Sequence, residues 1–302
     1  MAGGIARYLT PEQLQRLSRL TLNSRLVVEG NLAGRHRSPL RGASTEFADH
    51  RAYIEGDDPR RIDWKVFGRT ERYFVRRYED ETNLRVYLAV DRSASMGYAS
   101  GARRSKYDYA CHLAAAIGYV VVKARDSVGL CLYSDRTHAF LAARNTLVHL
   151  DNLLSVLADH PPALGTPTAT ASTLHELAES VRKRALIVLF SDLFDDGEAI
   201  HHALAHFRKQ HHDVILFHVL DPDEIDFPFR RGAEFEDMEN RERLLVDPRR
   251  LAAEYRAIVA DFLEQCRKSC VDLNMDYRLA RTDQPFDRLV QAYLEERKRL
   301  SR

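Results

Sequence analysis

Short apolar runs alternate with longer amphipathic stretches along most of this 302-residue chain. The short runs are rich in Val, Ile and Leu and predict buried strands, at 86–90, 128–133, 185–190 and 214–220. Between them, apolar residues return every three or four positions and predict helices, at 105–125, 147–157, 172–184 and 198–209. This alternation predicts an α/β fold in which a doubly wound, mostly parallel sheet is flanked by helices on both faces.

The C-terminal part extends the same pattern with one irregular insertion. Residues 137–141 predict a strand that pairs with 128–133 as a hairpin. A Pro in the first turn is a helix-start signal, so a long helix is expected to open at Pro248. The other predicted elements of this part are a β-hairpin, a last strand and a terminal helix, at 233–236 with 243–246, 273–279 and 286–298.

A different kind of segment precedes the first sheet strand. Residues 8–30 have leucines at helical spacing, which predicts a helix, and residues 34–83 are dense in Arg, Asp and Glu. We therefore expect residues 1–83 to form an N-terminal helix and a charged extension that packs on the core. Residues 84–302 are expected to form the sheet domain with its C-terminal continuation.

Polar side chains follow directly on the first sheet strand. Asp91, Ser93 and Ser95 alternate along the chain, so in an extended turn all three can lean toward one point. The carboxyl end of a strand is where an α/β sheet exposes such groups. Hard oxygen ligands of this kind suit Mg²⁺ or Mn²⁺. The pattern D-x-S-x-S therefore predicts the beginning of a metal site.

Two later segments offer the further ligands that an octahedral ion needs. The loop 164–168 contains Thr166 just before a helix, and the strand 185–190 ends in Ser191 and Asp192. Thr168 is a rival to Thr166 as the ligand, and either could instead cap the next helix. Asp195 and Asp196 follow closely, but Asp192 comes first after the strand, where the sheet edge opens.

Composition and charge narrow the class of protein. Hydrophobic residues make up 45% of the chain and charged residues 29%, which is ordinary for a globular protein. A net charge of +1 gives no electrostatic reason to expect a nucleic-acid partner. We find no apolar run of the roughly 18 residues that span a bilayer, no signal-peptide pattern, and four cysteines without framework spacing. A cytoplasmic protein without direct membrane insertion is expected.

Two residue pairs at helical spacing raise the question of a second metal. Cys266 and Cys270 share one face of a predicted helix, but nothing nearby completes four zinc ligands, so two thiols on an apolar stripe are expected. His202 and His206 also share a face. Solvated histidines are the expected interpretation there, with a metal pair as the alternative.

The order of the oxygen-bearing motifs resembles a known arrangement. D-x-S-x-S, then Gly-Thr, then a strand ending in Ser-Asp is the order of von Willebrand factor A domains, whose site is the metal-ion-dependent adhesion site. The chain as a whole resembles the bacterial family called domain of unknown function 58. The segments that carry this resemblance are SPLRGASTEFADHR at 38–51, YIEGDDPRRIDWK at 53–65, RRYEDETN at 76–83, Asp247-Pro248 and Tyr293-Leu294.

The resemblance implies a von Willebrand factor A-like domain that acts with MoxR-type AAA+ ATPases, beside which such proteins are often encoded. Position by position, Asp91, Ser93 and Ser95 match the first metal motif, Thr166 the second and Asp192 the third. If the site resembles a metal-ion-dependent adhesion site, the hydroxyls bind the ion directly and the two carboxylates mostly hold its waters. One open position then accepts a partner's Asp or Glu. We expect a metal-dependent adaptor with Mg²⁺ or Mn²⁺ and a MoxR-type AAA+ ATPase as its partner.

Two other interpretations of the first motif are open. Metal-dependent phosphoester hydrolysis would need a further carboxylate, for which Asp195, Asp196 or Glu198 could serve. The chain has no phosphate loop ending in Lys-Ser or Lys-Thr and no G-x-S-x-G elbow, so no enzyme is expected. The other alternative is that D-x-S-x-S merely caps a helix beginning near Arg103.

The charged extension is a second candidate surface. Interleaved signs usually mark a solvated, salt-linked face, and a partner-docking face is the alternative. If it docks a partner, charge reversal at Arg60 and Arg61 should weaken capture without unfolding the domain. The basic residues concerned are Arg60, Arg61, Lys65, Arg69, Arg72, Arg76 and Arg77.

Overall fold

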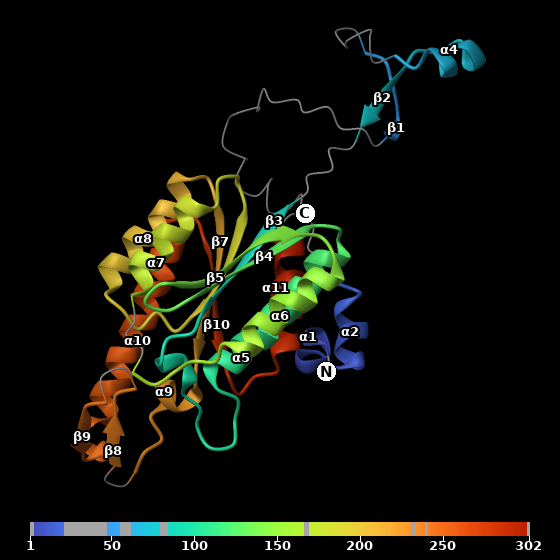
Figure 1. Cartoon of the computed structure of the whole chain (residues 1–302). Coiled ribbons are helices and arrows are strands. Elements are labelled where there is room, and N and C mark those ends of the chain that lie inside the picture. The colour runs from blue at the N-terminus through green and yellow to red at the C-terminus, as the bar shows by residue number, and fades with distance from the viewer. Residues whose placement is uncertain are drawn as a thin grey trace. The chain divides into compact units, whose positions relative to one another are not determined.

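The structure of the chain is a computed structural model that describes residues 3–20, 47–54, 62–78, 84–165, 169–230, 233–238 and 241–300. The chain divides into two compact units. One unit consists of Met1–Val27 together with Leu84–Arg302, and the other is Val28–Asn83. Figure 1 shows the sheet of the larger unit between its two groups of helices.

The larger unit is built on a six-stranded sheet in the order β10-β7-β6-β3-β4-β5. Its strands pair in parallel except β5, which runs antiparallel to β4. The strands are β3 (Arg85–Asp91), β4 (Ser127–Tyr133), β5 (Thr137–Arg144), β6 (Leu186–Ser191), β7 (Asp213–Leu220) and β10 (Asp276–Arg281). The predicted mostly parallel sheet flanked by helices is therefore confirmed.

Helices cover both faces of this sheet. One hydrophobic core joins it to α1, α2, α5, α6 and α11, and a second core joins it to α7, α8 and α10. The bounds are α1 (Gly4–Tyr8), α2 (Pro11–Leu17), α5 (Lys106–Lys123), α6 (Leu147–Asp159), α7 (Thr170–Ser180), α8 (Gly197–Lys209), α10 (Pro248–Asp272) and α11 (Phe286–Leu300). A short α9 (Pro222–Asp226) follows β7, and a 3₁₀ turn (Ser95–Gly97) follows β3.

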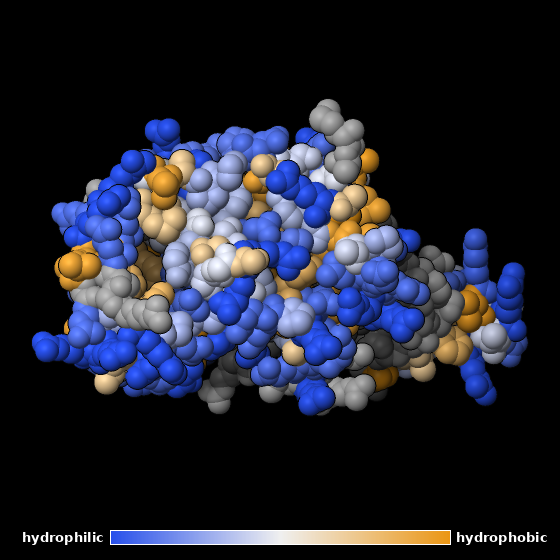
Figure 2. All heavy atoms as spheres, turned by 90° about the horizontal axis from the view of Figure 1, so that it is seen from below, coloured by the Kyte–Doolittle hydropathy of each residue, from blue (hydrophilic) through white to orange (hydrophobic). Residues whose placement is uncertain are grey.

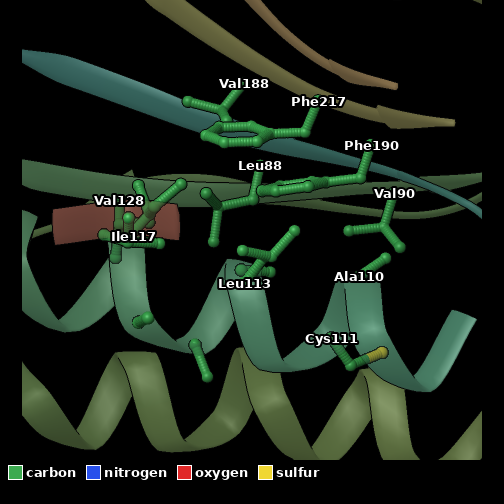
Figure 3. Packing of buried hydrophobic residues seen from close by; sticks show 14 of the residues in the cluster. Leu88, Val90, Ala110, Cys111, Leu113, Ile117, Val128, Val188, Phe190 and Phe217 are labelled. Carbon is green, nitrogen blue, oxygen red and sulfur yellow. The ribbon is translucent and has the colours of Figure 1, made fainter. Parts of the chain in front are cut away.

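The central strand β3 supplies both cores, because successive side chains of a strand point to opposite faces. Leu88 and Val90 pack in the first core, and Tyr87 and Ala89 in the second. Figure 3 shows Leu88 and Val90 pointing onto α5, opposite Leu113 of that helix. All of these strand residues are buried, which is why this strand is a continuous apolar run.

The C-terminal insertion follows the prediction closely. The hairpin consists of β8 (Ala233–Glu236) and β9 (Arg243–Val246), the predicted bounds. The helix that follows begins at Pro248, and the Asp247 side chain caps it by accepting a hydrogen bond from the N–H of Arg249 at 3.1 Å. Side-chain oxygens are strong N-caps and Pro fits the first helical position, so the boundary was readable from the sequence.

Three predicted boundaries were wrong. The predicted helix over 8–30 does not begin at residue 8, because α1 ends at Tyr8 and the extended Thr10 caps a separate helix, α2, through a capping box with Gln13; α2 ends at Leu17, and residues 21–30 lie outside the described part. The helix over 172–184 ends at Ser180. The strand over 273–279 begins only at Asp276, because α10 continues to Asp272 and Asn274 turns through a positive φ of 51°.

The smaller unit contains two antiparallel strands and one helix in its described part, β1 (Phe47–Ala52), β2 (Phe74–Tyr78) and α4 (Trp64–Thr70). Asp63 caps α4 by accepting hydrogen bonds from the N–H groups of Lys65 and Val66. The rings of Phe67 and Tyr73 stack with centroids 4.5 Å apart. Aromatic stacking thus joins this short helix to the start of the following strand.

The described helices include none that is both long and apolar enough to cross a membrane. The face of the molecule in Figure 2 is mostly hydrophilic, and its hydrophobic residues appear in small, separate groups.

Candidate functional site

The strand order reverses at β3. From β3 the chain crosses to β4 on one side, and it later returns to β6 on the other side. In open α/β sheets, ligands bind outside the carboxyl ends of strands at such a switch point. The strands that flank this switch point are β3, which ends at Asp91, and β6, which ends at Ser191. Topology therefore places the first and third predicted motifs at one crevice.

Asp91 joins these two strand ends. Its side chain is fully buried, and Oδ2 accepts a hydrogen bond from the hydroxyl of Ser191 at 2.7 Å. Its other oxygen, Oδ1, accepts from the N–H of Ser93 at 2.8 Å. Burial, followed by the nearby charge of Asp192, raises the pKa of Asp91 to about 7. A carboxyl held in this way is stabilised in its charged form by any cation that approaches it.

The two serines of the first motif lie close together. The Oγ atoms of Ser93 and Ser95 are 3.1 Å apart, within hydrogen-bond distance. The chain then makes a single 3₁₀ turn. The alternative that this motif caps the next helix is wrong, because Ser105 caps α5 by accepting a hydrogen bond from the N–H of Asp108 at 3.1 Å. Both serine hydroxyls are therefore free of helix capping.

Asp192 carries an ion pair inside the protein. The Nζ of Lys106 lies 2.7 Å from Oδ2 of Asp192 and 2.6 Å from Oε1 of Glu224. The Lys106 side chain is 0% exposed. Burial alone would lower the pKa of Lys106, but the two carboxylates hold it above its ordinary value. The lysine is therefore a permanent cation next to the strand end.

A buried histidine positions the backbone of Asp192. The carbonyl oxygen of Asp192 lies 2.8 Å from Nε2 of His218 on β7. Because a carbonyl can only accept, Nε2 carries the proton, and Nδ1 then accepts from the hydroxyl of Tyr277 at 3.0 Å. Burial lowers the pKa of His218 to about 4, so this ring is neutral at pH 7.

The end of β7 supplies a third carboxylate-bearing segment. Asp221 and Glu224 form a capping box around α9. Asp221 also accepts hydrogen bonds from the N–H of Ser100 at 3.2 Å and from the hydroxyl of Thr282 at 3.1 Å. These bonds join the loop after the first motif to the ends of β7 and β10.

The β8–β9 hairpin reaches the same place. The N–H of Gly165, in the loop of the second motif, donates to the carbonyl oxygen of Met238 at 2.9 Å. A Cβ on Gly97 would lie 3.4 Å from the Met238 methyl group. A pocket of about 380 Å³ opens here, lined by Ser95, Tyr98, Phe194, Glu224 and the hairpin residues 236–238.

Of the predicted ligands, Asp91, Ser93, Ser95 and Asp192 lie in this region. Thr166 and its rival Thr168 lie outside the described residues. The two neighbouring carboxylates hold helix ends: Asp195 accepts from the N–H of Ala171 on α7, and Asp196 caps α8. Glu198 pairs with His202 at 3.8 Å.

The two residue pairs considered for a second metal, Cys266 with Cys270 and His202 with His206, are not part of a larger ligand group in the described part of the chain. His206 contacts His175 at 2.9 Å between their Nδ1 atoms, and not His202. Within the described ranges, no group of three or more His, Cys, Asp and Glu side chains is placed to hold an ion. Cys270 is buried, Cys266 is half-buried, and both are free thiols.

Only part of the charged extension is described. Lys65, Arg69 and Arg72 are exposed, in agreement with a solvated face. Arg60 and Arg61 lie outside the described residues, and the side chains of Arg76 and Arg77 are not described. The docking alternative for this surface stays a prediction.

Sequence reasoning missed Lys106, Glu224 and Met238. The signal for Lys106 was present, because a lysine in a helix that is otherwise apolar on nearly every side needs a buried partner. Its partners lie 86 and 118 residues away along the chain. No local pattern identifies them.

Comparisons with known proteins identify a family and name no activity. The model of the family described as protein of unknown function DUF58 matches residues 49–265. An uncharacterized protein, Rv1480, of Mycobacterium tuberculosis is 28% identical over 88% of this chain and 86% of its own length. An aerotolerance-related membrane protein of Bacteroides fragilis is similar with a TM-score of 0.49 at 16% identity, over 72% of this chain and 99% of the other. BatB of Bacteroides thetaiotaomicron has a TM-score of 0.45 at 16% identity, over 72% and 98%.

Proposed function

The chain belongs to the family of proteins of unknown function DUF58, and we propose that it is a von Willebrand factor A-like, metal-dependent adaptor. In this proposal a divalent ion at the switch point binds an acidic residue of a partner protein. The observation that carries it is the buried Asp91 carboxyl, which accepts from Ser191 at 2.7 Å next to the paired hydroxyls of Ser93 and Ser95.

The donor set fits Mg²⁺ or Mn²⁺. Ligands of Mg²⁺ lie at about 2.1 Å in octahedral geometry, so two neighbouring ligands are about 3 Å apart. The hydroxyl oxygens of Ser93 and Ser95 are 3.1 Å apart. These serines and Thr166 would hold the ion directly, and Asp91 and Asp192 would hold its waters. When bound, the ion supplies a Lewis-acidic position that accepts a carboxylate.

The local charge balance also supports a divalent ion. The carboxylates of Asp192 and Glu224 contact the single ammonium of Lys106, and the charge of Asp192 acts on the nearby carboxyl of Asp91. With all of them ionised, two negative charges are unmatched, and one divalent cation balances them. Buried carboxylates without such a balance are strongly disfavoured.

An adhesive role fits an ion that has few negatively charged ligands. Neutral hydroxyl ligands leave a bound ion electron-poor, so it attracts a carboxylate from outside. Of the carboxylates considered for hydrolysis, Asp195 and Asp196 hold the helix ends of α7 and α8, and Glu198 pairs with His202. We therefore do not advance that alternative. From the family resemblance, we propose a MoxR-type AAA+ ATPase as the partner.

Affinity capture tests this function. The purified chain is immobilised and offered the MoxR-type AAA+ ATPase encoded in the same genome, in Mg²⁺ or in EDTA. We expect retention in Mg²⁺, loss in EDTA, and loss with Asp91→Ala. Asp261→Ala, at an exposed position on α10, is the matched control and should retain the ATPase. Retention that is indifferent to EDTA and to Asp91→Ala would contradict the proposal.

A further inference from the structure

One level of the sheet carries a polar side chain on each of four neighbouring strands. Asp91 of β3 pairs with Tyr133 of β4, and Ser191 of β6 pairs with His218 of β7. All four residues are completely buried. Each follows a residue of the second core by two positions, and alternate residues of a strand share a face. The four side chains therefore form one row on the face of the sheet that the second core covers.

Three members of this row have hydrogen-bond partners, and Tyr133 has none. Ser191 donates to Asp91 at 2.7 Å, and the two ring nitrogens of His218 have partners at 2.8 and 3.0 Å. The buried hydroxyl of Tyr133 forms no hydrogen bond within the described ranges. Burial, followed by the charge of Asp91, raises the pKa of Tyr133 well above its ordinary value, and Ser191 acts in the opposite direction. The phenol thus lies near both residues, outside hydrogen-bond geometry with either.

A second unpaired hydroxyl lies at the start of α7. Thr170 is the first residue of this helix and is completely buried, and its hydroxyl also has no partner among the described residues. The N–H of Ala171 donates to Asp195, after β6, at 3.3 Å, and the hydroxyl of Thr173 donates to the carbonyl oxygen of Ser134, after β4, at 3.4 Å. Because β3 lies between β6 and β4, the start of α7 crosses the carboxyl end of β3.

Two unpaired hydroxyls at one crevice indicate a polar occupant. Buried hydroxyls without a partner are rare in proteins, because they lose their hydrogen bonds to water without replacement. A magnesium ion keeps several of its waters when it binds a protein. A water on a cation turns its oxygen to the ion and its hydrogens outward, so it donates, and a protein hydroxyl can accept.

We propose that the hydroxyls of Tyr133 and Thr170 position the hydration shell of the divalent ion, each by accepting a hydrogen bond from one of its waters. The Tyr133 hydroxyl then donates its own proton to Asp91, its neighbour in the row, and thereby also orients that carboxylate. Outer groups of this kind fix the ligands of a metal and raise its affinity. The inference rests on the proposed function, because only a bound ion supplies the shell.

Removal of single hydroxyls tests this role. Tyr133→Phe should lower the Mg²⁺ affinity at least fivefold in calorimetric titration, and Thr170→Val at least threefold. Tyr109→Phe is the matched control, because Tyr109 is a buried tyrosine whose hydroxyl has no partner in the described part, but it packs in the first core, on the other face of the sheet. Its affinity should stay within twofold. Affinity equal to that of the wild type in Tyr133→Phe would overturn the inference, and the same result in Thr170→Val would remove Thr170 from it.

Thermal unfolding in EDTA separates this role from a structural one. Tyr133→Phe and Tyr109→Phe should each unfold at or above the wild-type temperature, because each variant loses an unpaired buried hydroxyl. Added Mg²⁺ should raise the unfolding temperature less in Tyr133→Phe than in Tyr109→Phe. A clear loss of thermal stability of Tyr133→Phe in EDTA would show that the hydroxyl has a partner without the ion, which would overturn the inference.

The phenol also reports on the ion directly. The chain has 13 tyrosines, which can be labelled with ¹³C at the ring carbon that bears the hydroxyl. The Tyr133 signal is the one that Tyr133→Phe lacks, and the Tyr109 signal is identified in the same way. We expect Mg²⁺ to shift the Tyr133 signal and to leave the Tyr109 signal in place. A Tyr133 signal that stays in place while Mg²⁺ binds would overturn the inference.

Failure of this inference and failure of the proposed metal site give different results. If the wild-type protein binds Mg²⁺ through Asp91 and Tyr133→Phe binds it equally well, only the role of the hydroxyl is overturned. If the wild type binds no Mg²⁺, or binds it as Asp91→Ala does, the metal site is contradicted and this inference is overturned with it.

Discussion

The ammonium of Lys106 lies 2.7 Å from a carboxylate oxygen of Asp192, and both side chains are buried. The same ammonium contacts Glu224 at 2.6 Å, so one cation joins the ends of β6 and β7. The contact fixes Asp192 at the crevice, whereas Asp91 accepts hydrogen bonds from the N–H of Ser93 and the hydroxyl of Ser191. A metal ion at this crevice would therefore act chiefly on Asp91.

Removing the internal cation should destabilise the fold. Lys106→Met leaves the buried Asp192 and the partly buried Glu224 without their partner, and loss of a buried partner typically costs about 3–5 kcal/mol. The free energy of unfolding in urea measures this cost. Lys123→Met, at the exposed end of the same helix, should change it by less than about 0.5 kcal/mol. A loss below about 1 kcal/mol for Lys106→Met would contradict the assigned ion pairs.

The neutral His218 ring predicts a pH dependence of stability. Unfolded histidine takes up its proton near pH 6.5, whereas burial lowers the pKa of folded His218 to about 4. The unfolded state therefore binds more protons between these values, and stability falls as pH falls from about 6.5 to about 4. His218→Gln should remove up to about 3 kcal/mol of this pH-dependent change.

The comparison must separate His218 from other histidines. Burial also lowers the pKa values of His112 and His212, so the wild-type protein should lose stability in the same window for several reasons. The difference between variant and wild type, measured by urea unfolding at pH 7 and at pH 4.5, isolates one residue. A constant difference across this range would show that folding does not lower the pKa of His218.

Position 129 on β4 needs a glycine, because atoms of neighbouring residues lie too close to leave room for a Cβ. A Cβ there would lie 2.7 Å from the Leu141 carbonyl oxygen and 2.7 Å from the Tyr87 ring. Backbone and a packed ring yield little, so Gly129→Ala should cost about 1–3 kcal/mol. Gly197→Ala is the control, because a Cβ at Gly197 meets nothing within 4 Å. Thermal unfolding of the two variants should differ clearly, and equal midpoints would contradict the register.

The second motif can be assigned by substitution. We predict that Thr166→Val lowers Mg²⁺ affinity at least tenfold, because a hydroxyl ligand becomes a methyl group of similar size. Thr168→Val should change the affinity less than twofold. Titration of each variant with Mg²⁺ measures both, and the opposite ranking would move the ligand to Thr168.

Much of the sheet could be predicted because its signals are local. The apolar run of β6 is buried at every position, so its hydrophobicity alone marks the strand. The start of α10 was readable from Asp247 and Pro248. The start of α2 also had a signal, Thr10 before Pro11, but the prediction followed the spacing of Leu14, Leu17 and Leu20 and began the helix at residue 8.

The remainder of the site depends on distant contacts. Lys106 is the first residue of α5, and only the sheet order brings Glu224 to it. The hairpin was predicted with the observed bounds, yet nothing in its sequence indicates that Met238 meets Gly165. Such placement comes from tertiary packing of segments more than 70 residues apart along the chain, which periodicity does not encode.

The central claim is that a divalent ion binds through Asp91, and calorimetric titration with Mg²⁺ and Mn²⁺ tests it most directly. We predict one equivalent bound by the wild-type protein and none by Asp91→Ala. Asp196→Ala, which removes only the cap of α8, should bind like the wild type. Equal binding by wild type and Asp91→Ala, or none by the wild type, would contradict the account.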